Sequence, residues 1–202
     1  MLNFLRNRRP EVVAPEQAAL QAEFEYYLGL PLDDFEYVPY QLSMGIVSRT
    51  SERPLISGLD TPILDCAIMA VFTQSGHTGL MHISPQTLPE DYYTTAGEHH
   101  GVHHTNVPQK YLELLAKLRH PVTHITIVGG DDTLVHELRS FVTGGSNAWK
   151  RNLNPILSVS SEALGTNQAK IVIAIPSEQS TLIGCRLPKS KLANGNRFAK
   201  IH

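Results

Sequence analysis

The segment ILDCAIMAVFTQSGHTGLMHIS, residues 63–84, decides how this chain folds. Residues 63–74 are nearly continuously apolar, with Asp65 and Cys66 as the polar members, and a second apolar run follows at 80–84. The glycine-containing turn at 74–79 separates the two runs, which is the pattern of two strands joined as a hairpin. A buried helix beginning near Cys66 is the alternative, because periodicity does not separate the two structures at this length.

The flanking segments alternate between helical and strand patterns. Strong helix formers from Glu16 to Gly29 predict a helix with a glycine stop, and amphipathic patterns predict helices at 107–120 and 132–145. Buried strands are predicted at 124–130, 154–161 and 169–176. Residues 51–62 are rich in turn formers, and the chain after Leu187 is a polar, basic tail. Interleaved helices and strands predict an α/β fold, a layered sandwich with a mixed central sheet packed by helices.

Length and composition limit the number of domains and the classes of partner that we expect. With 202 residues and 42% hydrophobic content, one domain over residues 16–202 is expected, after a flexible N-terminal arm at 1–15 that contains Pro10 and Pro15. The net charge of -2 gives no basic field for nucleic acid. We expect no membrane span and no classical signal peptide, hence a cytoplasmic protein or one delivered to another cell by another route.

Cys66 and His82 are the candidate catalytic pair. A cysteine nucleophile needs an imidazole to take its proton and a third group to orient that imidazole. Cys66 stands at the start of the first predicted hairpin strand, and His82 follows sixteen residues later across the turn. Paired strands would place the two side by side near the open end of the sheet. A small, inert core residue is the other interpretation of Cys66. Cys185 is interpreted as structural, with a resolving thiol as the alternative.

These residues resemble a known family. DTPILDC at 60–66, GLMHI at 79–83 and a later strand ending in VGG at 128–130 are similar to motifs of the CheD-type chemoreceptor glutamine deamidases. That family shows a threonine, then L-G-x-C, G-L-x-H and a strand with F-G-G. The wider deamidase superfamily includes the cytotoxic necrotizing factor toxins and a Burkholderia lethal factor. The resemblance covers about residues 60–130, with 170–184 as a possible closing strand.

The resemblance implies a role for each matching residue. Cys66 would be the nucleophile, His82 the general base and Thr61 the third polar group. Asp65 and Gly79 would lie at substrate-binding or oxyanion positions. The implied activity is hydrolysis of a glutamine side chain in a partner protein, with no metal or organic cofactor. Such a protein needs neither nucleic acid nor a membrane as partner, and the sequence does not define its oligomeric state.

Asp65 departs from the family pattern, in which glycine or serine precedes the cysteine. A carboxylate beside a thiol disfavours the thiolate that acts as nucleophile. The spacing from Thr61 to Cys66 is also one residue short. An inactive, deamidase-like binding protein is therefore the alternative function, with Asp65 as the mark of lost activity.

The stretch GEHHGVHHTN at 97–106 carries a second hypothesis. His99 and His103 are four residues apart, as are His100 and His104, so each pair would share a helix face and could chelate zinc. Gly97 and Gly101 disfavour a firm helix, and Glu98 is the one evident acidic ligand. A solvated, histidine-rich surface loop is the simpler interpretation, and a metal-binding protein is the third functional alternative.

Overall fold

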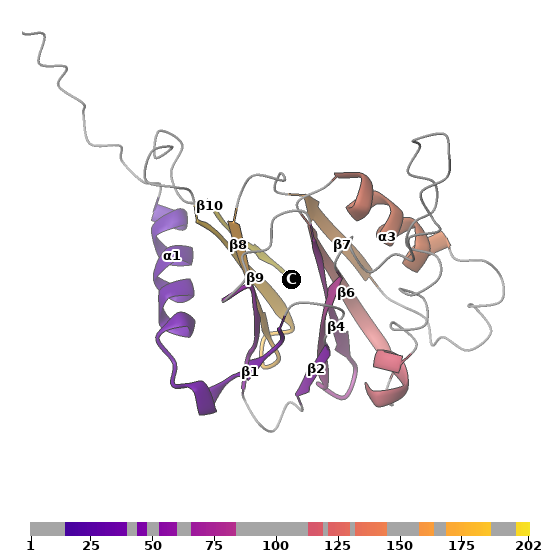
Figure 1. Cartoon of the computed structure of the whole chain (residues 1–202), viewed down its shortest axis with the longest axis horizontal. Helices are drawn as coiled ribbons and strands as arrows, with labels where there is room; N and C mark the ends of the chain where they lie inside the picture. The colour runs from indigo at the N-terminus through magenta and orange to yellow at the C-terminus, as the bar shows by residue number, and fades with distance from the viewer. Residues whose placement is uncertain are drawn as a thin grey trace, which may run out of the picture.

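The chain folds into four layers, with two β-sheets face to face in the middle and helices outside each sheet (Figure 1). The computed structural model describes residues 15–39, 44–47, 53–59, 66–83, 113–118, 121–129, 132–144, 158–163, 169–186 and 197–202. The predicted α/β sandwich is confirmed. Its centre holds two mixed sheets of five strands each, where the sequence predicted one mixed central sheet.

The first sheet has the strand order β1-β3-β8-β9-β10. Its strands are β1 (Glu36–Tyr37), β3 (Leu55–Ser57), β8 (Ala169–Ile175), β9 (Ser180–Arg186) and β10 (Arg197–Ile201). β1 runs parallel to β3, and the other pairs are antiparallel.

The second sheet has the order β2-β5-β4-β6-β7. Its strands are β2 (Met44–Val47), β5 (Thr78–Ile83), β4 (Ala67–Thr73), β6 (Val122–Gly129) and β7 (Ser158–Ala163). β6 and β7 are parallel, and the remaining pairs are antiparallel.

Helices cover the outer face of each sheet. α1 (Pro15–Leu28) packs on the first sheet, and the 3-10 turn η1 (Leu32–Asp34) leads from it to β1 (Figure 1). α3 (Asp132–Gly144) and the helical residues 113–118 pack on the second sheet. No helix in the described part of the chain is long and apolar enough to cross a membrane.

The predicted hairpin is confirmed as β4 and β5, which pair from Ala67↔Ile83 to Phe72↔Thr78. Gly76 has φ 86°, a left-handed conformation that glycine adopts without strain, and its N–H donates to the Thr73 carbonyl across 2.9 Å. Every residue of β4 is buried, because one face meets the helices and the other meets the first sheet. Burial on both faces explains the continuous apolar run.

Two sequence interpretations are corrected by the structure. The turn-rich stretch at 51–62 contains strand β3, and the polar tail contains β10, whose Phe198 is buried. Local sequence patterns do not predict β3 and β10, because these strands are short or partly polar and their pairing partners lie far away in the chain. The strand predicted at 154–161 corresponds to β7, and residues 154–157 lie outside the described ranges.

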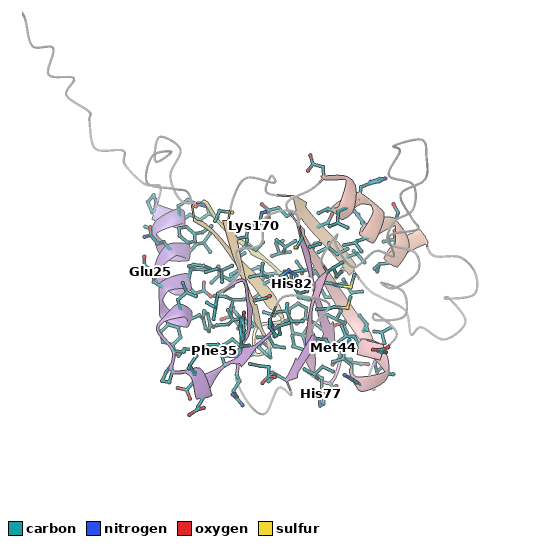
Figure 2. All side chains as sticks on the ribbon, in the orientation of Figure 1. Glu25, Phe35, Met44, His77, His82 and Lys170 are labelled. Carbon is teal, nitrogen blue, oxygen red and sulfur yellow. The ribbon has the colours of Figure 1, made fainter. Side chains whose placement is uncertain are left out.

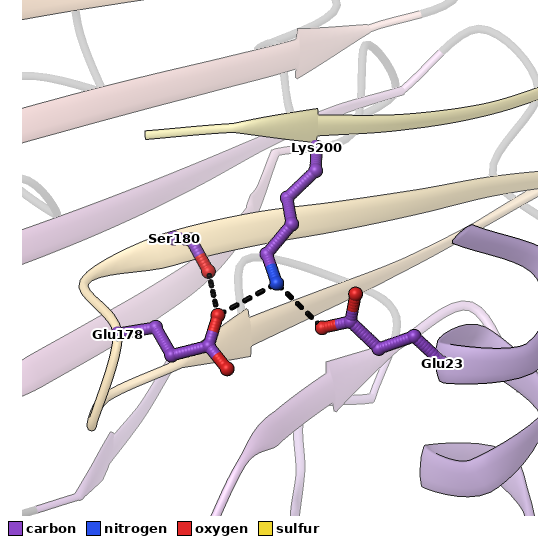
Figure 3. Close-up of polar contacts among 4 residues, drawn as sticks. All are labelled: Glu23, Glu178, Ser180 and Lys200. Atoms are coloured by element: carbon purple, nitrogen blue, oxygen red, sulfur yellow. Dashed lines mark hydrogen bonds and ion pairs between the residues drawn. The ribbon is translucent and has the colours of Figure 1, made fainter. Parts of the chain in front are cut away.

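Polar contacts fix α1 to the C-terminal strand. The Gln17 amide donates to the Phe198 carbonyl at 3.0 Å and accepts from its N–H at 3.1 Å. The Lys200 ammonium lies 2.6 Å from both Glu23 and Glu178, and the Ser180 hydroxyl donates to Glu178 (Figure 3). The hydrogen bond from Lys200 lowers the pKa of Glu178. Burial opposes the charge on Lys200, but the two carboxylates outweigh it and raise the pKa of that lysine.

Replacing Lys200 with methionine should lower the free energy of unfolding at pH 7 by about 1 kcal/mol or less, because Glu178 is 42% exposed and solvent screens the pair. A carboxyl whose pKa is depressed by folding stabilises above its unfolded pKa, and that stability is lost as pH falls through the folded value. The deficit of Lys200→Met should therefore shrink towards pH 3, as measured by urea unfolding at several pH values. Lys117→Met, at an exposed lysine, is the control. A deficit that does not change with pH would contradict the assignment.

Candidate active site

Cys66 lies immediately before β4, at the end of the second sheet where β5 and β6 finish. Its side chain is 7% exposed and belongs to the apolar cluster between the two sheets, together with Ile68, Ala70 and Leu80. Side chains alternate along a strand, so this shared face follows from their even spacing. The thiol therefore points into the layer between the sheets, near its margin.

His82 lies on β5 and faces the same layer. It pairs with Ile68, two residues after Cys66, and its side chain is 1% exposed. Cys66 and His82 are thus diagonal neighbours on one face of the hairpin, a relationship that lies within reach of side chains as long as histidine. Figure 2 shows His82 between the two sheets.

Ser57, on β3 of the opposite sheet, orients the imidazole. Its Oγ lies 3.1 Å from His82 Nδ1 and 2.8 Å from the Val38 carbonyl oxygen. The carbonyl can only accept, so the single hydroxyl proton of Ser57 goes to Val38. Ser57 Oγ then accepts a hydrogen bond from His82 Nδ1–H. In the neutral imidazole, this geometry places the proton on Nδ1 and leaves Nε2 as the unprotonated ring nitrogen.

This arrangement has the parts of a cysteine nucleophile with a general base. A histidine held in the Nδ1–H tautomer can take a thiol proton at Nε2, and the hydroxyl that holds it serves as the orienting third group. Cys66 and Cys185 are both thiols in the structure and take no part in a disulfide. The structure thus places Cys66 and His82 on one face of the hairpin, and their roles as nucleophile and general base stay predictions.

Two glycines of the predicted motifs lie at different places relative to Cys66. Gly79 faces away from Cys66, towards the helical layer, where a Cβ would come within 2.7 Å of Leu114. The structure does not bring Gly79 to the cysteine; its missing side chain lets the helix approach. Gly129 pairs with Ala67 and so ends β6 beside Cys66.

Several predicted residues lie outside the described ranges: Thr61, Asp65, His99, His103 and Gly130. Their assigned roles stay predictions. Among the described residues, no group of three or more His, Cys, Asp or Glu side chains could hold a metal ion.

Sequence reasoning missed Ser57. It lies in the turn-rich stretch, outside the motifs that carry the family resemblance. Its role depends on the first sheet packing over the second, which the local sequence does not reveal. The one available signal was its position directly after the apolar pair Leu55 and Ile56.

A second buried histidine, His124 on β6, has a different environment. Its Nδ1 lies 2.5 Å from Ser158 Oγ, and its Nε2 lies 2.7 Å from Thr126 Oγ1 and 3.2 Å from Ser160 Oγ. Burial, and secondly the charge of His202, lowers its pKa. It pairs with Phe72, at the end of β4 remote from Cys66. This cluster is a hydroxyl network that satisfies a core histidine.

Comparisons with known proteins give a structural likeness without a sequence match. No family model and no curated protein matches the chain. Among solved structures, the fold is similar to the C-terminal domain of CNFy from Yersinia pseudotuberculosis, with a TM-score of 0.38 and 10% sequence identity. The alignment covers 82% of this chain and 61% of that chain. This chain thus spans less than two thirds of the structure it matches.

Replacing Ser57 with alanine should remove the acceptor for His82 Nδ1–H and cost about 1–3 kcal/mol of stability, since a buried donor is left without its bond. Nitrogen-15 NMR of the ring should show the Nδ1–H tautomer in the unmodified protein and a mixture in the variant. Ser75→Ala is the matched control, because Ser75 Oγ lies 2.9 Å from His77 Nδ1 at an exposed site. An Nε2–H tautomer in the unmodified protein would refute the assignment.

Proposed function

We propose that this protein is a cysteine-dependent amidohydrolase that deamidates a glutamine side chain in a partner protein. The observation that carries the proposal is the orientation of His82 by Ser57 on the same inter-sheet face as Cys66. The choice of glutamine rests on the resemblance of residues 60–66 and 79–83 to the CheD-type deamidases.

The reaction would proceed through a thioester. His82 Nε2 takes the proton of Cys66, and the sulfur attacks the carbon of the glutamine amide. The oxyanion of the tetrahedral intermediate is held by backbone N–H donors next to Cys66. The intermediate collapses as the imidazolium returns its proton to nitrogen, and the C–N bond breaks to release ammonia. His82 then activates water, which hydrolyses the thioester to glutamate and restores the thiol.

The proposed chemistry sets the conditions under which the protein acts. Every step is a proton transfer or an acyl transfer, so the protein needs no metal or organic cofactor. The thiolate must stay reduced, which suits a cytosol, either that of the producing cell or that of a cell into which the protein is delivered. A protein substrate is proposed because the CheD-type deamidases, which residues 60–66 and 79–83 resemble, act on proteins.

The first test is the reactivity of Cys66 towards iodoacetamide as a function of pH. Peptide mass spectrometry separates Cys66 from Cys185, which is the internal control because it is also buried. We expect Cys66 to reach half of its maximal rate at least one pH unit below the ordinary thiol value of about 8.5. An ordinary profile for Cys66 would refute a catalytic thiolate.

The second test is conversion of glutamine to glutamate in proteins. A bacterial and a mammalian cell extract are each incubated with the protein, and the extract proteins are analysed by mass spectrometry. We expect one or a few glutamines to be converted, with none converted by Cys66→Ser or His82→Ala. Partner binding without Cys66-dependent conversion would favour the inactive, deamidase-like binding protein.

A further inference from the structure

Lys170 on β8 is a fully buried lysine, with 0% of its surface exposed. Lysine is almost never fully buried unless its charge is compensated, because removing an ammonium group from water is costly. A charged group kept in the interior at this cost is a candidate for a functional role when it lies beside a reactive site. The position of Lys170 relative to Cys66 therefore matters.

Lys170 faces the layer between the two sheets. Along β8, Val172 and Ala174 belong to the cluster between the sheets, whereas Ile171 and Ile173 belong to the cluster under α1. By alternation, Lys170 shares the face of Val172. Figure 2 shows Lys170 on the first sheet, towards the end at which β8 begins. Cys66 and His82 face this same layer from the opposite sheet.

Lys170 also lies at the same end of the layer as Cys66. Ser57 pairs with Val172 and contacts His82, so Val172 and His82 stand at one level of the two sheets. Lys170 lies two residues before Val172 and is therefore the next residue on that face of β8. Cys66 likewise lies two residues before Ile68, the partner of His82, and is the next residue on that face of the hairpin.

A second contact between the sheets shows that Lys170 and Cys66 lie beyond Val172 and His82 in the same direction. Leu55 pairs with Ala174 and packs against Gly45, which pairs with Leu80. The step from Leu55 to Ser57 therefore runs with the step from Leu80 to His82. Continuing in that direction leads to Lys170 on one sheet and to Cys66 on the other, so the two residues share the same margin of the layer.

Other titratable groups face this layer at different places. Cys185 on β9 pairs with Lys170 on β8. Glu162, on the edge strand β7, pairs with Val128 on β6. Burial raises the pKa of Glu162. Glu36 pairs with Leu55 at the far edge, and His124 lies at the level of Phe72 near His202. Cys185 is thus the direct cross-strand neighbour of Lys170, and Cys66 lies at the same margin of the facing sheet.

We infer that Lys170 is a positioning residue of the proposed active site, whose ammonium group favours the thiolate of Cys66. The inference rests on the proposed function, since it concerns the same cysteine. A lysine near a cysteine favours the thiolate, and the effect is strong where water is excluded and the local dielectric is low. Lys170 would add to the imidazolium of His82 a second positive charge that favours the thiolate before it attacks the amide carbon.

The test is the pH profile of Cys66 alkylation by iodoacetamide in Lys170→Met, which removes the charge and keeps the length of the side chain. We expect Cys66 to react about tenfold more slowly at pH 7 than in the unmodified protein, with the difference vanishing at alkaline pH. Lys170→Arg should retain most of the effect. Lys117→Met, at an exposed lysine on the outer helical layer, should change nothing.

The outcomes separate this inference from the proposed function. If Cys66 has an ordinary profile in the unmodified protein, the proposed function fails. If Cys66 is activated in the unmodified protein and Lys170→Met has the same profile, the role of Lys170 fails and the proposed function stands.

A reciprocal measurement applies if Lys170→Met does not fold. The pH titration of the Lys170 side chain is followed by carbon-13 NMR in the unmodified protein, in Cys66→Ser and in Cys185→Ser. Because coupling between two charges is mutual, removing the Cys66 thiolate should lower the midpoint for Lys170 by about one pH unit. No shift in Cys66→Ser, or a shift confined to Cys185→Ser, would overturn the inference.

Discussion

The strand β4 is buried on both of its faces, and this constraint shapes the rest of the molecule. A strand covered on both sides needs a helical layer against one face and a second sheet against the other. Its partner β5 is equally buried, so the hairpin has no solvent-facing side on which polar residues could lie. Polar groups that the hairpin retains must find partners inside the layers. His82 does so through Ser57 on the opposite sheet.

The sequence predicted the parts of the fold that are locally encoded. The apolar runs on either side of the Gly76 turn predicted the hairpin, and helix formers ending at Gly29 predicted α1. The placement of Cys66 and His82 on one face of the hairpin was also predicted from the hairpin pattern. The second sheet could not be predicted in this way. Its strand β3 has three residues, and β10 mixes basic and apolar residues within a polar tail.

The orienting group of the site illustrates the same limit. Thr61 was predicted from a motif, at a fixed distance before the cysteine in the sequence, and it lies outside the described residues, so its role stays a prediction. The structure places Ser57 against His82, and this contact exists only because two sheets from distant parts of the chain pack together. Hydroxyl groups are common in any chain, so the sequence cannot tell which of them meets the imidazole. The tautomer is decided by a still more remote atom, the carbonyl of Val38.

The layer between the sheets therefore combines two opposing demands. Apolar burial holds the sheets together, yet it disfavours the thiolate that the proposed chemistry requires, because a charge in an apolar layer loses its hydration. In the proposed cycle, sulfur carries a negative charge only until it bonds to the amide carbon, and the imidazolium of His82 balances the charge in that state. A permanent cation such as Lys170 on the facing strand would stabilise the thiolate in the same state. The low dielectric of the layer raises the free-energy cost of burying the ammonium group. The same low dielectric strengthens the attraction of the ammonium group to the thiolate sulfur.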